Sequence, residues 1–203
     1  FLMARRMEAA GDTTGALAAL ERARKLDPAS AEIAAEIAGN HSRQDRLAEA
    51  VPSGEQALQL DKDNVEAHHV LAVVYSTWAD GAEPPPAGQT VAGARARAIE
   101  HLNAIQSTPL VATNPNLQMT LGRLQLRAGK ADLAVPILEK VAQQVPWAAE
   151  PLVLLYEAQT TLGRIEDAGA TLLAAAQINP RYWATLGQFY ERQDKWAEAA
   201  AAY

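Results

Sequence analysis

The stretch Tyr182–Tyr203 reads YWATLGQFYERQDKWAEAAAAY and holds two short amphipathic patterns separated by a polar break. The first pattern places four residues on one face of a helix, at offsets 0, 3, 4 and 7: Trp183, Leu186, Gly187 and Tyr190. The second pattern does the same with Trp196, Ala199 and Tyr203. Each helix is apolar on one side only, so a pair of this size cannot bury its apolar faces alone. The stretch therefore predicts a helix pair that packs against copies of itself.

Related patterns recur along the rest of the chain. One column consists of six alanines, with spacings of 34, 48, 36, 34 and 31: Ala16, Ala50, Ala98, Ala134, Ala168 and Ala199. A second column, upstream of each alanine, consists of large residues: Met3, Ile37, Leu71, Leu121, Leu155 and Leu186. Small residues let two antiparallel helices approach closely, and large ones fill the space to the next pair. A period near 34 residues with two helices per unit is typical of a stacked helical solenoid.

These columns resemble the tetratricopeptide repeat, whose first helix carries Trp, Leu, Gly and Tyr and whose second carries Ala, an aromatic residue and Ala before a Pro. The last unit matches this pattern at Trp183, Leu186, Gly187, Tyr190, Ala199 and Tyr203. The first unit matches it at Ala16, Leu20, Ala23 and Pro28. The resemblance covers the chain apart from one insertion. It implies an all-α fold, a right-handed α-solenoid (superhelix) of stacked antiparallel helix pairs.

We expect residues 1–203 to form one array of about six helix pairs. The expected units are 1–28 (partial), 29–64, 65–112, 113–147, 148–180 and 181–203 (partial). The third unit is 14 residues longer than the period of 34, and the excess falls in a Pro-rich loop at 79–92 between its two helices. Both ends of the sequence read as helix interiors, so we expect a fragment of a longer chain.

The units depart from the family pattern at a few positions. Tyr156 stands where a small residue is usual, which predicts a splayed or rotated fifth pair. Gly54 replaces a large residue, and Pro52 and Pro136 fall inside predicted second helices. Because an internal proline removes a helix hydrogen bond, we expect a tolerated kink at each.

Composition excludes several classes of function. The 203 residues are 49% hydrophobic and carry a net charge of −6, which disfavours nucleic-acid binding because phosphate contacts need clustered Lys and Arg. No apolar run of 18 residues occurs, so we expect no membrane insertion. The chain has no cysteine and is rich in alanine, a composition that suits a bacterial protein of either cytoplasm or periplasm.

No pattern in the sequence predicts catalysis. His68 and His69 are adjacent on a predicted helix and point about 100° apart, which is poor geometry for a shared metal ion. His41 and His68 fall on core-facing columns, where a packed, hydrogen-bonded histidine is the default. No phosphate-binding, dinucleotide-binding or hydrolase motif is present. We therefore expect a non-enzymatic protein with no catalytic residue, cofactor or metal.

The first helix of each pair lines the concave side of such a solenoid, so its non-core residues should face a groove. The resulting candidate groove is His69, Val73, Met119, Arg123, Leu126, Arg127, Val153 and Glu157. Apolar anchors beside arginines form a plausible peptide-binding surface. The alternative is that His69, Val73 and Val153 pack against each other across a tightly curved groove. The Lys-Asn clamp by which some family members hold a peptide's carboxylates is missing, which disfavours a chaperone-tail adaptor.

The Pro-rich loop is a second candidate for partner binding. Pro84, Pro85 and Pro86 favour an extended segment, and insertions in repeat arrays often lie on a binding edge. Ala87 stands where a PxxP motif would need its second proline. We favour a tolerated insertion over a partner loop.

Three functions remain open. The first is a scaffold that binds a protein or peptide, and the second is a structural subunit that self-associates end to end or sits within a larger assembly. The third is the regulatory or targeting arm of an enzyme whose catalytic domain lies outside this sequence.

Overall fold

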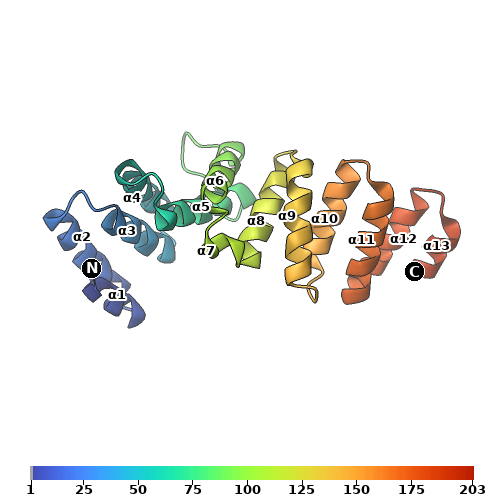
Figure 1. Ribbon diagram of the computed structural model, residues 1–203, viewed down its shortest axis with the longest axis horizontal. Helices are drawn as coiled ribbons and strands as arrows, with labels where there is room; N and C mark the ends of the chain where they lie inside the picture. The colour runs from blue at the N-terminus through green and yellow to red at the C-terminus, as the bar shows by residue number, and fades with distance from the viewer. Residues whose placement is uncertain (1) are drawn as a thin grey trace. The chain divides into compact units, whose positions relative to one another are not determined.

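The computed structural model describes residues 2–203, and within them the fold is all-α (Figure 1). Thirteen α-helices and one 3-10 helix are present among these residues, with no strand. The chain divides into two compact units: the first unit ends at Val111 and the second unit is Ala112–Tyr203.

The first unit contains three antiparallel helix pairs, α1 with α2, α3 with α4 and α5 with α6. Their bounds are α1 (Leu2–Ala9), α2 (Thr13–Leu26), α3 (Ala31–Arg43), α4 (Leu47–Leu60), α5 (Val65–Asp80) and α6 (Val91–Ile105). Successive pairs also pack on each other, α3 on α2 and on α5. A single turn, α7 (Pro109–Ala112), lies in the sequence at the division between the units.

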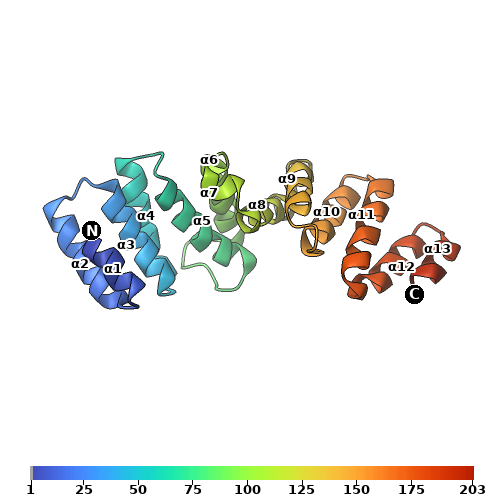
Figure 2. The same ribbon diagram turned by 60° about the horizontal axis from the view of Figure 1, so that its bottom comes forward.

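The second unit repeats the same arrangement with α8 on α9, α10 on α11 and α12 on α13 (Figure 2). Their bounds are α8 (Pro115–Arg127), α9 (Ala131–Gln144), α10 (Glu150–Thr161), α11 (Ile165–Ile178), α12 (Trp183–Glu191) and α13 (Trp196–Ala202). The 3-10 helix η1 (Pro180–Tyr182) leads directly into α12. The prediction of stacked antiparallel helix pairs is thus confirmed.

The alanine column forms the close contacts within the pairs. All six of its alanines are at most 3% exposed. The column of large residues is buried as well, with one exception: Met3 on α1 is 62% exposed. The prediction that Met3 fills a core is therefore wrong, because within the described residues no helix precedes α1 to cover that side.

The turns between the two helices of a pair place one residue in the left-handed region of backbone space. Glycine occupies that position at Gly11, Gly129 and Gly163, with φ between 71° and 80°. Asp45 and Asp194 occupy it in the second and last pairs, with φ of 61° and 59°. Since left-handed backbone favours glycine, these two aspartates hold strained turns.

The inserted loop is shorter than the sequence predicts and spans residues 81–90. Gly81 ends α5 in the left-handed conformation, with φ of 75°, so α5 continues to Asp80. Thr90 begins α6 because its Oγ1 accepts a 3.0 Å hydrogen bond from the Gly93 amide. The helix ends, and not the prolines, therefore set the limits of the loop.

Side-chain packing explains two departures from the repeat pattern. A Cβ on Gly54 of α4 would lie 2.8 Å from Cγ of Leu71 on α5, so Leu71 fills the space of the missing side chain. Tyr156 on α10 packs edge-to-face on Phe189 of α12, with ring centroids 5.7 Å apart. Its bulk is thus directed to the next pair.

Candidate partner-binding surfaces

The first helices of the second unit carry most of the predicted groove residues. Met119 and Arg123 lie on α8, and Val153 and Glu157 lie on α10, which contacts α8. Met119 and Val153 are half-buried, whereas Glu157 is exposed. On each helix an apolar residue is followed four positions later by a charged one, so the two lie on the same side of the helix. This α8/α10 face therefore offers both apolar area and charge.

The last turn of α8 adds two further candidates with different environments. Arg127 is exposed. Leu126 is half-buried and packs against the core cluster of α9 and α10 that includes Ala131 and Leu155. Leu126 thus supports the helix contact, and the exposed charge at this end of the face comes from Arg127.

The electrostatics of the α8/α10 face involve Glu157 and Arg127. Desolvation by neighbouring atoms raises the pKa of the Glu157 carboxyl, and the Arg127 charge opposes this by lowering it. The two groups are therefore close enough to interact.

The first unit carries the two remaining groove candidates on α5. His69 is half-buried, and Val73 is 39% exposed. The Val73 carbonyl also accepts a hydrogen bond from the Thr77 hydroxyl at 3.0 Å. These side chains form a small face of their own on that helix.

Prolines 84 to 86 lie in the inserted loop, Pro84 exposed and the other two half-buried. The end of this loop closes a pocket of about 280 Å³ in the first unit, which the sequence analysis missed. Its lining comes from α4, α5, the loop and α6: Glu55, Tyr75, Gly88, Gln89, Thr90, Gly93 and Arg97. The position of the insertion could have pointed to this space, because residues 88–90 at its C-terminal end line the pocket.

A histidine pair lies behind Tyr75. His68 of α5 and His101 of α6 approach with their Nδ1 atoms 3.0 Å apart, and the Tyr75 ring stacks on His101 at 5.7 Å. Nε2 of His68 lies 3.0 Å from the Lys62 carbonyl and must donate to it, so Nδ1 of neutral His68 accepts from His101. Burial, followed by the nearby charges of His68 and Arg97, lowers the pKa of His101 to about 4. His101 is therefore neutral near pH 7.

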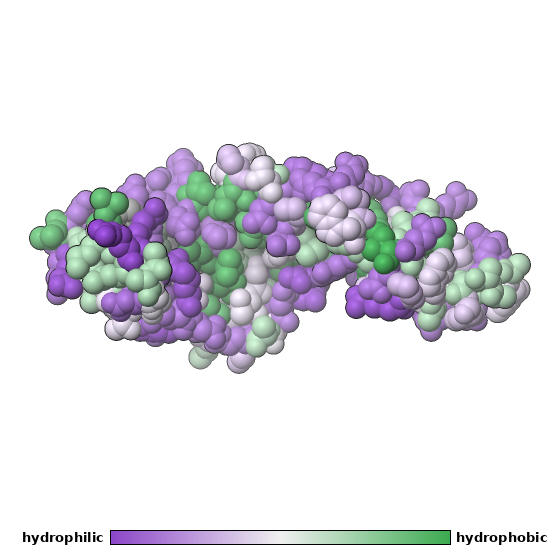
Figure 3. Space-filling model, turned by 90° about the horizontal axis from the view of Figure 1, so that it is seen from below, coloured by the Kyte–Doolittle hydropathy of each residue, from purple (hydrophilic) through white to green (hydrophobic). Residues whose placement is uncertain are grey.

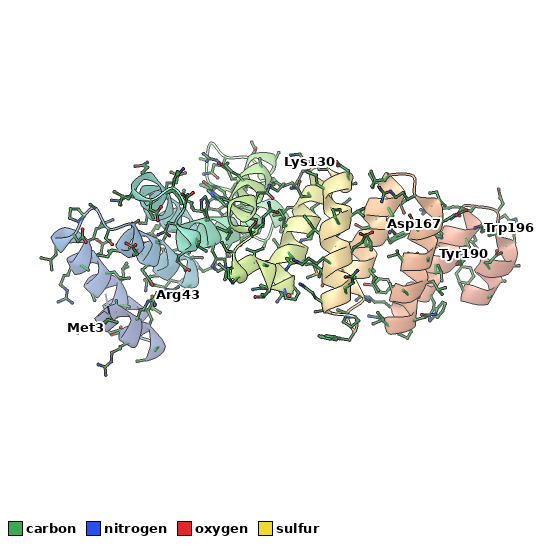
Figure 4. All side chains as sticks on the ribbon, in the orientation of Figure 1. Met3, Arg43, Lys130, Asp167, Tyr190 and Trp196 are labelled. Atoms are coloured by element: carbon green, nitrogen blue, oxygen red, sulfur yellow. The ribbon has the colours of Figure 1, made fainter. Side chains whose placement is uncertain are left out.

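A polar network joins α1 to α3 in the first unit. Glu36, only 9% exposed, accepts a 2.8 Å hydrogen bond from Nε of Arg5. Asn40 is fully buried and donates to Oε1 of Glu8 at 2.8 Å and to the Thr13 carbonyl. Arg43 reaches from α3 to the same Glu8 carboxylate at 2.5 Å (Figure 4). Because each buried group has a partner, this network is structural.

The described part of the chain shows neither a metal-binding cluster nor a membrane span. Among residues 2–203, no group of three or more His, Asp or Glu side chains could hold a metal ion. The helices of that same range include none long and apolar enough to cross a membrane. The face seen in Figure 3 is largely hydrophilic, with hydrophobic residues gathered in small groups.

These helix pairs are similar to those of known repeat proteins. Residues 125–189 match the tetratricopeptide repeat family. No curated protein sequence shows a significant match. Similar solved structures include YrrB, described as a TPR protein with an unusual peptide-binding site. It is 17% identical with a TM-score of 0.71, covering 91% of this chain and 88% of that chain.

Two further solved structures share the fold. MamA from Desulfovibrio magneticus RS-1 is 19% identical with a TM-score of 0.64, covering 85% of this chain and 90% of that chain. TTC0263, a thermophilic TPR protein in Thermus thermophilus, is 20% identical with a TM-score of 0.52, covering 98% of this chain and 95% of that chain. At these identities the likeness is one of fold.

Proposed function

We propose that this chain is a tetratricopeptide repeat protein and that it acts as a non-enzymatic scaffold, which binds a protein or peptide through the α8/α10 face. The observation that carries this proposal is the pairing of half-buried Met119 and Val153 with charged residues one turn further along each helix. Apolar anchors rimmed by arginine are the usual hot spots of protein interfaces. The peptide-binding site named for YrrB supports the same kind of role.

The charges on the face indicate the chemistry of the partner. Arg123 and Arg127 outnumber Glu157, so the face is positive within a chain whose net charge is −6. Guanidinium groups bind carboxylates through paired hydrogen bonds. We therefore propose a partner segment that carries an apolar side chain near an Asp or Glu. The α5 face of His69 and Val73 is proposed as a separate contact surface of the first unit.

A peptide array of acidic–apolar sequences, with basic counterparts, tests the proposal. Met119→Glu and Arg123→Glu should each weaken binding by about tenfold or more, because they remove an anchor and reverse a charge. Lys130→Glu is the matched control, since it makes the same charge reversal in the exposed turn after α8 (Figure 4). Equal losses for Lys130→Glu and Arg123→Glu would contradict the assignment of the face.

Exposed apolar residues favour a second candidate function, self-association. Trp196 is 63% exposed and Tyr203 66% exposed in the second unit, and Leu2 is 78% exposed in the first. Large apolar side chains left in water are a common mark of an interface. Light scattering of the wild type and of Trp196→Glu decides this candidate: an oligomer that the substitution dissociates supports it, and a monomer in both cases excludes it.

A further inference from the structure

The pocket at the inserted loop has a fixed base in the first unit. Its floor is Tyr75, which is only 3% exposed. The Tyr75 ring stacks on His101 at 5.7 Å and meets Trp78 edge-to-face at 5.5 Å, so two aromatic neighbours hold it in place. The walls come from α4, α6 and the C-terminal end of the loop, and the volume is about 280 Å³. The insertion therefore encloses a small space on a rigid floor.

The carboxylate of this pocket is positioned by the floor. Glu55 lines the pocket from α4 and is half-buried. Desolvation raises the pKa of the Tyr75 phenol, and the charge of Glu55 and a hydrogen bond to its carboxylate raise that pKa further. A phenol donates a single hydrogen bond, whereas a carboxylate has two acceptor oxygens. Glu55 therefore keeps acceptor capacity for a ligand on a side chain that Tyr75 holds in place.

The guanidinium of this pocket comes from α6. Arg97 lines the pocket, and its Nη1 lies 3.9 Å from Oε2 of Glu100, which is longer than a hydrogen bond. The Arg97 charge lowers the pKa of Tyr75 and the Glu55 charge raises it, so both groups lie near the same hydroxyl. Within the described residues, however, no ion pair joins Glu55 to Arg97. Two opposite charges thus line one small pocket without neutralising each other.

The mixed charge of the pocket selects among classes of ligand. A cation is repelled by Arg97 and an anion is repelled by Glu55, so a ligand with a single charge gains from only one of the two groups. An uncharged ligand displaces water from both groups and replaces it with no opposite charge. A zwitterion, which carries an ammonium group and a carboxylate, pairs with both. The pocket therefore favours a small zwitterion.

We infer that this pocket binds a free α-amino acid with a small side chain, whose ammonium group donates to Glu55 and whose carboxylate accepts from Arg97. The volume of about 280 Å³ lies just below the range of pockets that hold drug-sized molecules, which suits a ligand of this size. Gly88 and Gly93 leave backbone without side chains at the wall. This inference concerns the first unit and does not depend on the α8/α10 face.

The experiment is a titration of the whole chain with L-alanine, followed by NMR at the backbone amides of Gly88 and Gly93. Two analogues are the matched ligand controls. N-acetyl-L-alanine keeps the carboxylate and lacks the ammonium group, and L-alaninamide keeps the ammonium group and lacks the carboxylate. We expect saturable shifts at both glycines with Kd on the order of 1–10 mM for alanine, and affinity at least about fivefold weaker for each analogue.

The variants test the two charged groups separately. Glu55→Gln and Arg97→Gln each remove one charge from the pocket and should each weaken alanine binding by about fivefold or more. Glu49→Gln and Arg46→Gln are the matched controls, because they remove the same two charges from an ion pair at the start of α4 that does not line the pocket. The controls should alter the affinity by less than about twofold.

Three results would overturn the inference. They are the absence of saturable shifts at Gly88 and Gly93, an analogue that binds as tightly as alanine, and equal losses for the pocket variants and the control variants. An analogue of equal affinity would show that one charge is enough, the carboxylate for N-acetyl-L-alanine and the ammonium group for L-alaninamide. Because the shifts are read at residues of the first unit, loss of this site and loss of the α8/α10 face are distinguishable.

Discussion

The interior of the first unit contains ionisable side chains, whereas the buried polar residues of the second unit are all glutamines. Glu36, His41 and His101 are each at most 9% exposed in the first unit. Their counterparts in the second unit are Gln118, Gln125 and Gln159. Both units build the same helix pairs on the same alanine column. The same repeat can therefore carry either a charge-sensitive or a charge-insensitive interior, and only the former should respond to pH.

The largest expected change in the free energy of unfolding comes from removing a buried apolar side chain in the second unit. Leu138 is fully buried and lies against Gly122 of the facing helix. Leu138→Ala should lower the free energy of unfolding by about 2–5 kcal/mol, since it leaves a cavity that the helices cannot close. Denaturant unfolding at pH 7 and pH 5 measures this. A loss that differs between the two pH values would contradict the charge-insensitive character of this interior.

Acid should weaken the first unit through His101. Because the folded pKa is about 4 and the ordinary value is 6.5, the unfolded chain takes up a proton at a higher pH than the folded chain. The stability is therefore complete above about pH 6.5 and falls by up to about 3 kcal/mol as the pH drops to 4. Burial, followed by the Arg46 charge, lowers the pKa of His41 and adds a loss of the same sign.

The matched variant for this prediction is His101→Gln, which keeps a donor for His68 and cannot be protonated. It should flatten the pH dependence of hydrogen exchange at the α5 and α6 amides between about pH 6.5 and 4.5. In the second unit, the raised pKa of Glu157 acts in the opposite direction, since the folded form then binds the proton more readily. An acid loss of equal size at α10 amides would contradict the contrast between the units.

Replacing glycine by alanine should destabilise the protein where the glycine contacts a buried leucine, but not where it contacts a flexible side chain. Gly54→Ala puts a Cβ 2.8 Å from Cγ of buried Leu71 and should cost about 1–2 kcal/mol, despite the higher helix propensity of alanine. Gly39→Ala is the control, because its Cβ meets only the end of Arg43, at 3.0 Å. Thermal unfolding should show Gly39→Ala neutral or stabilised. A similar loss in both would mean that glycine at position 54 is not required by Leu71.

The smallest effect concerns the turns, where the two units are alike. Asp45→Gly in the first unit and Asp194→Gly in the second should each raise the free energy of unfolding by about 0.5–1 kcal/mol, because glycine adopts the left-handed backbone without strain. Gly129→Asp is the reverse control and should be destabilising. Unchanged melting temperatures would show that the two aspartates gain compensating hydrogen bonds.

The repeat architecture is predictable from the sequence because it depends on spacing. The alanine column, the turns at Gly11, Gly129 and Gly163, and the core positions of Leu71 and Leu121 follow from the period of 34. Each of these needs only the side of the helix on which a residue lies. The predicted groove residues fall on first helices for the same reason, and their role in binding stays a prediction.

The polar contacts are less predictable because they depend on which of several neighbours a side chain reaches. His101 lies 33 residues after His68, close to the repeat period, yet spacing alone does not tell that their Nδ1 atoms meet. Asn40 reaches back to Glu8, 32 residues earlier, for a similar reason. The pocket at Tyr75 required the path of the inserted loop, and composition does not determine that path.

The contact between Gly54 and Leu71 has a consequence for how the array folds. Glycine–side chain contacts at Gly122 and Gly187 lie within one helix pair, whereas Leu71 of the third pair occupies the gap left in the second. In a linear array, stability is the sum of each repeat's own term and the terms between neighbours. At the contact between α4 and α5, a larger share of the stability comes from the interface between neighbouring pairs. We therefore expect these two pairs to fold as one cooperative unit. Inserting or removing a repeat at this interface should therefore destabilise both pairs.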